Sequence, residues 1–191
     1  MIKKTLRDIS LRQKKVLMRV DFNVPLKDQK VADDNRIIKA LPSIQYVLNK
    51  NGLLILMSHL GRPKGKVDPE LSLKPVAEYL QTILDAPVYF ATNCIGAEAD
   101  EIIAQAKPGE IVLLENLRFH DGEKANDAPF SKQLAAHADI YINNAFGACH
   151  RSHASMTGVP KYLKPAAAGF LLQNEIEQLT KVTQNPAPPY V

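Results

Sequence analysis

Short apolar runs alternate with amphipathic helical patterns along this chain, and few folds accommodate that alternation. Between the runs, apolar side chains recur every three or four residues, which is the spacing of an amphipathic helix. Buried strands that alternate with helices predict a parallel sheet, with right-handed crossovers and helices on both faces. The runs with the length and apolar character of strands are residues 16–20, 53–57, 88–90, 111–114 and 140–142.

Four polar motifs directly follow four of these strands. In a Rossmann-like α/β fold of three layers, α/β/α, the loops at the carboxyl ends of the strands share one edge, where ligands bind. Arginine forks at such an edge grip phosphate or carboxylate groups, so the ligand is expected to be a phosphorylated, acidic small molecule. The motifs are residues 21–25 (DFNVP), 58–63 (SHLGRP), 115–119 (ENLRF) and 146–155 (FGACHRSHAS). The basic side chains expected to meet there are Arg62, Arg118, Arg151, His59, His150 and His153.

Two further polar positions accompany the first motif. Arg36 stands at the expected boundary between a loop and a helix, which suits an anion site. Asp21 and Asn23 are two residues apart at a strand end, so their side chains point the same way. Two interpretations remain open for this pair: they orient a hydroxyl-bearing substrate, or they form an Asx-type turn that leads into Pro25.

Turn residues predict where the helices begin and end. Pro42 fits a first turn, so the regular part of the first helix is expected to begin near it and to end at Gly52, a left-handed C-cap. Ser72 is the expected N-cap of the second helix. The second and later helices are expected at residues 73–84, 97–106, 129–138 and 169–182. A proline-rich segment, residues 183–191, follows the last of them.

The sequence does not predict a metal site, a catalytic thiol or a nucleotide-binding loop. The spacing of Cys149, His150 and His153 superficially suggests a metal cluster, but carboxylates are lacking nearby and Arg151 repels a cation, so no metal site is expected. The Gly61–Lys66 stretch is too short for a P-loop, and a valine stands where the loop needs Ser or Thr. Cys94 and Cys149 are expected to be reduced thiols in a cytosolic protein; an orienting partner for a catalytic Cys149 is not evident.

Composition argues against two classes of partner. The net charge of +4 is not collected into a basic run, and only 6% of residues are aromatic, which disfavours nucleic-acid binding. The apolar runs are far shorter than the ~18 residues of a membrane span, and the N-terminus lacks the apolar core of a signal peptide. We therefore expect a soluble, cytoplasmic protein that binds neither nucleic acid nor membrane.

The four motifs, in this order, closely resemble the N-terminal half of the phosphoglycerate kinase family, over essentially all 191 residues. The resemblance implies a glycolytic phosphotransferase with a carboxyl group as acceptor. It reversibly converts 1,3-bisphosphoglycerate and ADP into 3-phosphoglycerate and ATP, with Mg²⁺ carried by the nucleotide. It further implies that residues 1–168 form the phosphoglycerate-binding domain, that 169–182 form an interdomain helix, and that 183–191 link it to a nucleotide-binding domain outside this chain. The full-length enzyme is expected to be a monomer, and this chain alone is expected to be inactive.

The resemblance also implies roles for individual residues. Arg36 matches the catalytic arginine that steadies the transferring phosphoryl group, whereas Asp21 and Asn23 match residues that orient the glycerate. Asn144 departs from the Asp that is common in the family, and Cys149 replaces a small residue; neither change removes a substrate-binding position. The implied substrate-binding set is Asp21, Asn23, Arg36, His59, Arg62, Arg118 and Arg151, with a secondary basic patch at His150 and His153. A non-catalytic anion-binding module and a nucleic-acid-binding protein are the alternative hypotheses.

Overall fold

The computed structural model describes residues 4–184 and contains the predicted parallel sheet. Its strands lie in the order β5-β6-β4-β1-β7-β8, and every neighbouring pair is parallel. The short edge strand β8 (Ala166–Ala168) is not predicted by the sequence, because three alanines carry no strand signal. The five predicted strands are all present, as β1 (Lys15–Arg19), β4 (Leu53–Met57), β5 (Val88–Ala91), β6 (Ile111–Leu114) and β7 (Ile140–Asn143).

The remaining elements of the described chain connect or cover these strands. A small antiparallel hairpin, β2 (Leu26–Lys27) and β3 (Lys30–Val31), stands apart from the main sheet. Within residues 4–184 no helix combines the length and the apolar character that crossing a bilayer requires. The α-helices are α1 (Asn35–Asn49), α2 (Lys74–Ile83), α3 (Ala97–Gln105), α4 (Asp121–Ala125), α5 (Ala128–Ala136), α6 (Val159–Tyr162) and α7 (Phe170–Gln184). Shorter 3₁₀ turns cover Leu6–Asp8, Pro69–Leu71, Leu117–Phe119 and Phe146–Ala148, and a π-helical turn covers Ala154–Gly158.

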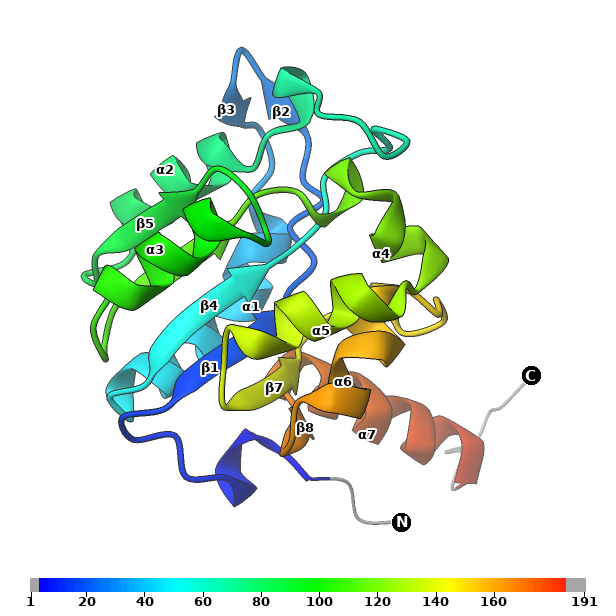
Figure 1. The fold of residues 1–191 in the computed structure, drawn as a ribbon. Helices are drawn as coiled ribbons and strands as arrows, with labels where there is room; N and C mark the ends of the chain where they lie inside the picture. The colour runs from blue at the N-terminus through cyan, green and yellow to red at the C-terminus, as the bar shows by residue number, and fades with distance from the viewer. Residues whose placement is uncertain (1–3, 185–191) are drawn as a thin grey trace.

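Helices cover both faces of the sheet, as Figure 1 shows. Successive side chains of a strand point to opposite faces, so each strand supplies two cores. In β1, Val16 and Met18 join the core that contains residues of α1 and α2, whereas Leu17 joins the core that contains residues of α3, α5 and α6. The three-layer α/β/α fold expected from the sequence is thereby confirmed.

The expectation for Pro42 is wrong. α1 begins at Asn35, and Pro42 lies inside the helix on its exposed side. The backbone N–H groups of Ile37 and Ile38 donate to the carbonyl oxygen of Asp34, which starts the helix a full two turns earlier. Burial of Ile37 and Ala40 stabilises those early turns and outweighs the hydrogen bond that a proline removes.

The left-handed residue at the end of α1 is Asn51, with φ 55°, and not Gly52 as predicted. Asparagine tolerates this conformation because its short polar side chain bonds locally. Gly52 is needed for a different reason. A β-carbon there would lie 3.1 Å from the carbonyl oxygen of Leu11 and 3.0 Å from a methyl group of Val47.

Ser72 is displaced by one position from its predicted role. α2 begins at Lys74 after Leu73, although the Ser72 hydroxyl still accepts the Lys74 N–H at 3.1 Å. The missing cap comes from another motif, because Glu115 accepts hydrogen bonds from the Leu73 N–H at 2.8 Å and from the Ser72 hydroxyl at 2.7 Å. A carboxylate beside the first turn also suits the positive end of the helix dipole.

Helix α7 is anchored at its start by two side chains from other elements. The Phe170 N–H donates to the hydroxyl of Ser43 in α1 at 2.9 Å, and the Leu171 N–H donates to Oδ1 of Asn144 at 3.1 Å. Ser43 donates in turn to that same Asn144 oxygen at 3.0 Å. The first free N–H groups of the helix are therefore satisfied from outside it.

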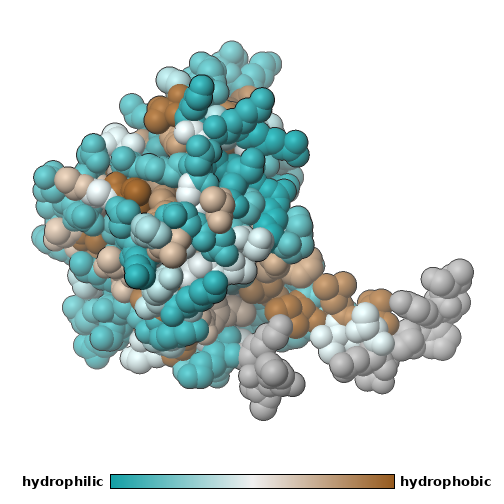
Figure 2. Space-filling view, turned by 45° about the vertical axis from the view of Figure 1, so that its right-hand side comes forward, coloured by the Kyte–Doolittle hydropathy of each residue, from teal (hydrophilic) through white to brown (hydrophobic). Residues whose placement is uncertain are grey.

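The far end of α7 exposes apolar side chains. Leu179 is 51% exposed and Val182 is 49% exposed. Figure 2 shows hydrophobic residues on the stretch that leads to the grey C-terminal atoms. The helix extends to Gln184, so residues 183 and 184 belong to it and not to the predicted linker, whose remaining residues 185–191 lie outside the described chain.

Asn116 joins two of the motif loops. Its side chain is fully buried and donates to the carbonyl oxygens of Leu60 at 2.7 Å and Leu71 at 2.9 Å. Its Oδ1 accepts the N–H groups of Leu60 at 3.2 Å and Arg118 at 3.0 Å. Four backbone groups thus depend on one amide.

We predict that Asn116→Ala lowers the free energy of unfolding by about 2–4 kcal/mol, because it leaves buried backbone groups without partners. Urea denaturation followed by circular dichroism measures the loss. Asn174→Ala, on the exposed side of α7, is the matched control and is expected to change stability by less than about 0.5 kcal/mol. A loss at Asn116 no larger than at Asn174 would contradict this account.

Candidate functional site

The strand order brings all four motif loops to one edge of the sheet. β1 lies between β4 and β7, and β4 is followed by β6, so the loops after these strands are neighbours. Hydrogen bonds join them: the Phe22 N–H donates to Oγ of Ser58 at 2.9 Å, and the Gly61 N–H donates to Oδ1 of Asn23 at 2.8 Å. The Leu117 N–H donates to the Ser58 carbonyl oxygen at 3.1 Å. The expected edge therefore exists.

A cavity of about 430 Å³ opens at this edge, and every residue that lines it is basic. The sequence predicts four of them but misses Lys64 and Lys124. Lys64 was within reach of sequence reasoning, since it stands between two glycines of the second motif loop. Lys124 lies on α4, and only the tertiary fold brings that helix here. The lining residues are Arg62, Lys64, Arg118, Lys124, Arg151 and His153.

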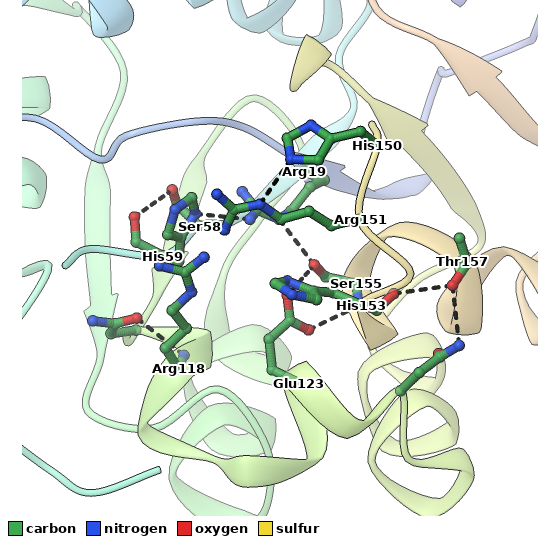
Figure 3. Close-up of polar contacts among 12 residues, drawn as sticks. Arg19, Ser58, His59, Arg118, Glu123, His150, Arg151, His153, Ser155 and Thr157 are labelled. Atoms are coloured by element: carbon green, nitrogen blue, oxygen red, sulfur yellow. Dashed lines mark hydrogen bonds and ion pairs between the residues drawn. The ribbon is translucent and has the colours of Figure 1, made fainter. Parts of the chain in front are cut away.

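Arg118 and Arg151 reach toward one another from different loops, as Figure 3 shows. The pKa of Arg118 is lowered, first by burial and then by the charges of Arg151 and Arg19. One Arg118 nitrogen donates to the Gly61 carbonyl oxygen at 2.6 Å, whereas its Nε is buried without a hydrogen-bond partner among the described residues. A bound anion would relieve the repulsion among these arginines and would accept a hydrogen bond from Nε of Arg118.

Arg19 is buried close to Arg118, is only 1% exposed and does not itself line the cavity. Its Nε donates to Oγ of Ser155 at 2.9 Å and its Nη2 donates to Nδ1 of His59 at 2.9 Å, while Nη1 donates to the Val20 carbonyl oxygen. Arg19 is not among the predicted site residues, because it lies inside an apolar run that predicts a strand. An arginine inside an otherwise apolar strand was nevertheless a signal, because a buried charge requires built-in partners.

His59 contributes a hydrogen-bond donor and not the positive charge that the sequence suggests. An arginine can only donate, so Nδ1 of His59 accepts and the ring proton sits on Nε2. Burial, followed by the charge of Arg19, lowers the pKa of His59 to about 2. The imidazole is therefore neutral near pH 7.

Glu123 places a fully buried carboxylate beneath these cations. Its Oε2 accepts the N–H of Ser155 at 2.9 Å and its Oε1 accepts the Ser155 hydroxyl at 2.6 Å. The Ser155 hydroxyl thus accepts from Arg19 and donates to Glu123. Nδ1 of His153 lies 3.7 Å from the same carboxylate.

Asp21 and Arg36 lie at this edge but do not line the cavity. They form an ion pair, in which Arg36 is 51% exposed and Asp21 is 16% exposed. The Asn23 N–H reaches the other oxygen of Asp21 at 3.4 Å, which is a long contact of the Asx-turn type. Both interpretations of this pair thus remain compatible with the structure. His150 is also outside the cavity and exposed, and its Nε2 accepts from Nε of Arg151 at 3.3 Å.

A sequence model of the phosphoglycerate kinase family matches residues 6–191. The chain belongs to the phosphoglycerate kinase family. Proteins named phosphoglycerate kinase from Moorella thermoacetica and Chlorobium chlorochromatii are 56% and 54% identical to it over 100% of its length. Each alignment covers 48% of the relative. The family resemblance expected from the motifs is confirmed.

Solved structures of the family share the fold. The phosphoglycerate kinase from Coxiella burnetii matches with a TM-score of 0.86 and 37% identity, over 98% of this chain and 47% of that one. The enzyme from Pyrococcus horikoshii matches with a TM-score of 0.88 and 31% identity, over 97% and 47%. This chain therefore spans about half the length of the phosphoglycerate kinases it matches.

The side chains that bind metal ions are scattered in the part of the chain that the structure describes. Among residues 4–184 no group of three or more His, Cys, Asp or Glu side chains is arranged to hold a metal ion. The Cys149 to His153 stretch instead sits among arginines that belong to the phosphoglycerate kinase motifs.

We predict that the neutral His59 makes the fold sensitive to acid. Its folded pKa lies below the unfolded value of 6.5, so its contribution is complete above pH 6.5 and is lost as the pH falls. The loss amounts to at most about 1.4 kcal/mol per pH unit. His59→Gln removes this term, so the stability gap between wild type and variant should narrow from pH 7 to pH 5 in urea titrations. The exposed His150→Gln is the control, and a constant gap for His59 would refute a neutral, buried imidazole.

Proposed function

We propose that this chain binds the acid substrate of the phosphoglycerate kinase reaction, 3-phosphoglycerate or 1,3-bisphosphoglycerate. The observation that carries the proposal is the cavity lined entirely by basic residues at the edge where four family motifs meet. Its volume of about 430 Å³ suits a small metabolite. The charge of the lining favours a ligand with several negative groups, and a phosphorylated carboxylic acid is one.

The roles follow the position of each side chain. Arg62, Arg118 and Arg151 are assigned to the phosphate group of the substrate, since they line the cavity. His59 adds a neutral Nε2–H donor beside them. His150 and His153 remain a secondary basic patch.

The glycerate end of the substrate is assigned to the neighbouring pair. Asp21 and Asn23 would orient its hydroxyl and carboxylate groups. Arg36 is assigned the catalytic role toward the transferring phosphoryl group. It lies in the first turn of the 15-residue helix α1, whose positive end favours negative charge.

Phosphoryl transfer also needs ADP or ATP with its magnesium ion, held in line with the acid substrate. We assign this second substrate to the part of the relatives that lies beyond the match. In this assignment residues 1–168 are the acid-binding domain, α7 is an interdomain helix, and the residues after Gln184 connect it to the nucleotide-binding domain. The half-exposed Leu179 and Val182 on α7 support a further packing partner. The full-length protein in this proposal is a cytoplasmic, monomeric enzyme of glycolysis.

We predict that the 191-residue chain binds 3-phosphoglycerate weakly and binds ADP not at all. Isothermal titration calorimetry at low and physiological salt measures both, and binding of 3-phosphoglycerate should weaken as salt rises, because exposed charges are screened. A coupled assay should detect no phosphoryl transfer, since positioning of both substrates supplies roughly 7–11 kcal/mol. Tight binding of ADP, or of a random oligonucleotide in preference to 3-phosphoglycerate, would refute the proposal.

We predict a division between two arginines. Arg62→Ala should weaken 3-phosphoglycerate binding by roughly 10- to 100-fold, because it removes a charge-assisted contact. Arg36→Ala should weaken it much less, because Arg36 lies outside the cavity and its proposed partner is the phosphoryl group in transfer. Calorimetry of both variants decides the matter, with the exposed Arg12→Ala as a control for net charge. Equal losses for Arg36 and Arg62 would contradict the assignment.

A further inference from the structure

The carboxylate of Glu123 is an unusual presence in a site built for anions. It is 0% exposed, and a negative charge so close to the cavity repels the ligand that the cavity attracts. Burial of a charge is costly unless the group is paired and hydrogen-bonded. Both oxygens are in fact hydrogen-bonded, to the N–H and the hydroxyl of Ser155. A costly and repulsive group that is so fully bonded calls for a role.

The hydrogen bonds of Glu123 lead to Arg19 and His59 in a defined order. The Ser155 hydroxyl gives its proton to Glu123, so it meets Nε of Arg19 as an acceptor. With Nε fixed, the planar guanidinium has one orientation, in which Nη2 donates to Nδ1 of His59. That bond fixes the His59 tautomer, and the Nε2–H is left for a ligand. Figure 3 shows Glu123, Ser155, Arg19 and His59 together with Arg118 and Arg151.

Glu123 also faces His153, which lines the cavity. Burial lowers the pKa of His153, and the charges of Arg118, Arg151 and Arg19 lower it further, whereas Glu123 raises it. His59 is another titratable neighbour and is neutral near pH 7, and the further groups that line the cavity, Arg62, Lys64 and Lys124, are cations. Among these groups Glu123 alone favours the protonated form of His153.

We infer that Glu123 is a positioning residue of the acid-substrate site: through Ser155 it orients Arg19 and His59, and it holds His153 ready to accept a proton when a dianion enters. This inference rests on the proposed function, because it explains how that site is prepared. Glu123 touches no ligand itself. Its effect on affinity comes through the three side chains that it orders.

The decisive variant is Glu123→Gln, because two roles of the carboxylate predict opposite results. Gln cannot accept both Ser155 donors, so loss of positioning should weaken binding about tenfold. If Glu123 only added negative charge, its removal would tighten the binding of any anion. Sulfate, which keeps its charge of two between pH 6 and 8, is the probe, with 3-phosphoglycerate measured beside it by calorimetry. Unchanged or tighter sulfate binding by Glu123→Gln overturns the inference.

A second readout concerns His153 directly. In ¹³C-labelled protein followed by NMR, the pKa of His153 should fall in Glu123→Gln, because the opposite charge that raises it is removed. A purely structural role would leave that titration in place. An unchanged His153 titration contradicts the second part of the inference.

Two further variants separate positioning from instability. Ser155→Ala keeps the carboxylate but removes the link to Arg19, so it should also weaken sulfate binding, and it carries the test if Glu123→Gln does not fold. Glu115→Gln is the matched control, since Glu115 is buried and caps α2 without contacting Ser155 or His153. It should destabilise the protein and leave sulfate affinity within about twofold. Wild-type protein that binds sulfate but not 3-phosphoglycerate would refute the proposed function and leave the Glu123 result interpretable.

Discussion

The parallel pairing of β1 with β4 on one side and β7 on the other determines where the residues of the candidate site lie. Arg19 is paired in register with Met57 and with Asn143, so three strands end at the same level. The loops that follow these three strands are therefore neighbours, and the loop after β6 lies beside the loop after β4. Side chains as far apart in sequence as Arg62 and His153 therefore share one cavity. A slip of two residues in either pairing would move one loop by roughly 7 Å and dissolve the site.

Close packing of so many cations is possible because the protein limits their charge from within. His59 stays neutral, so it adds no positive charge to the site but keeps its Nε2–H as a hydrogen-bond donor. Glu123 supplies a buried countercharge that reaches Arg19 through the hydroxyl of Ser155. The pKa of Arg118 is nevertheless lowered, first by burial and then by the charges of Arg151 and Arg19, and a bound anion would relieve the repulsion. Stability of the fold and attraction for an anion are thus balanced against each other in the same few residues.

Much of this could be predicted from the sequence, and the failures have physical causes. Strand runs and motif loops are local patterns, so the sheet and the cluster of Arg62, Arg118, Arg151 and His153 were foreseeable. The start of α1 was mistaken because burial of Ile37 overrides the local penalty of Pro42, and burial is not a local property. Lys124 and Glu123 were missed because α4 reaches the site only through tertiary packing. The neutral state of His59 depends on its burial and on its neighbour Arg19, and no pattern of spacing reveals either.

The anchored start of α7 has a mechanical consequence. A 15-residue helix is about 22 Å long, and its first N–H groups are held by Ser43 and Asn144, which stand on α1 and directly after β7. The helix is therefore a stiff arm with its pivot at the strand that also begins the Arg151 loop. A rotation of about 10° at that pivot displaces the far end by about 4 Å, given a helical rise of about 1.5 Å per residue. The position of the far end of the helix at Gln184 therefore depends on one serine and one asparagine at its start.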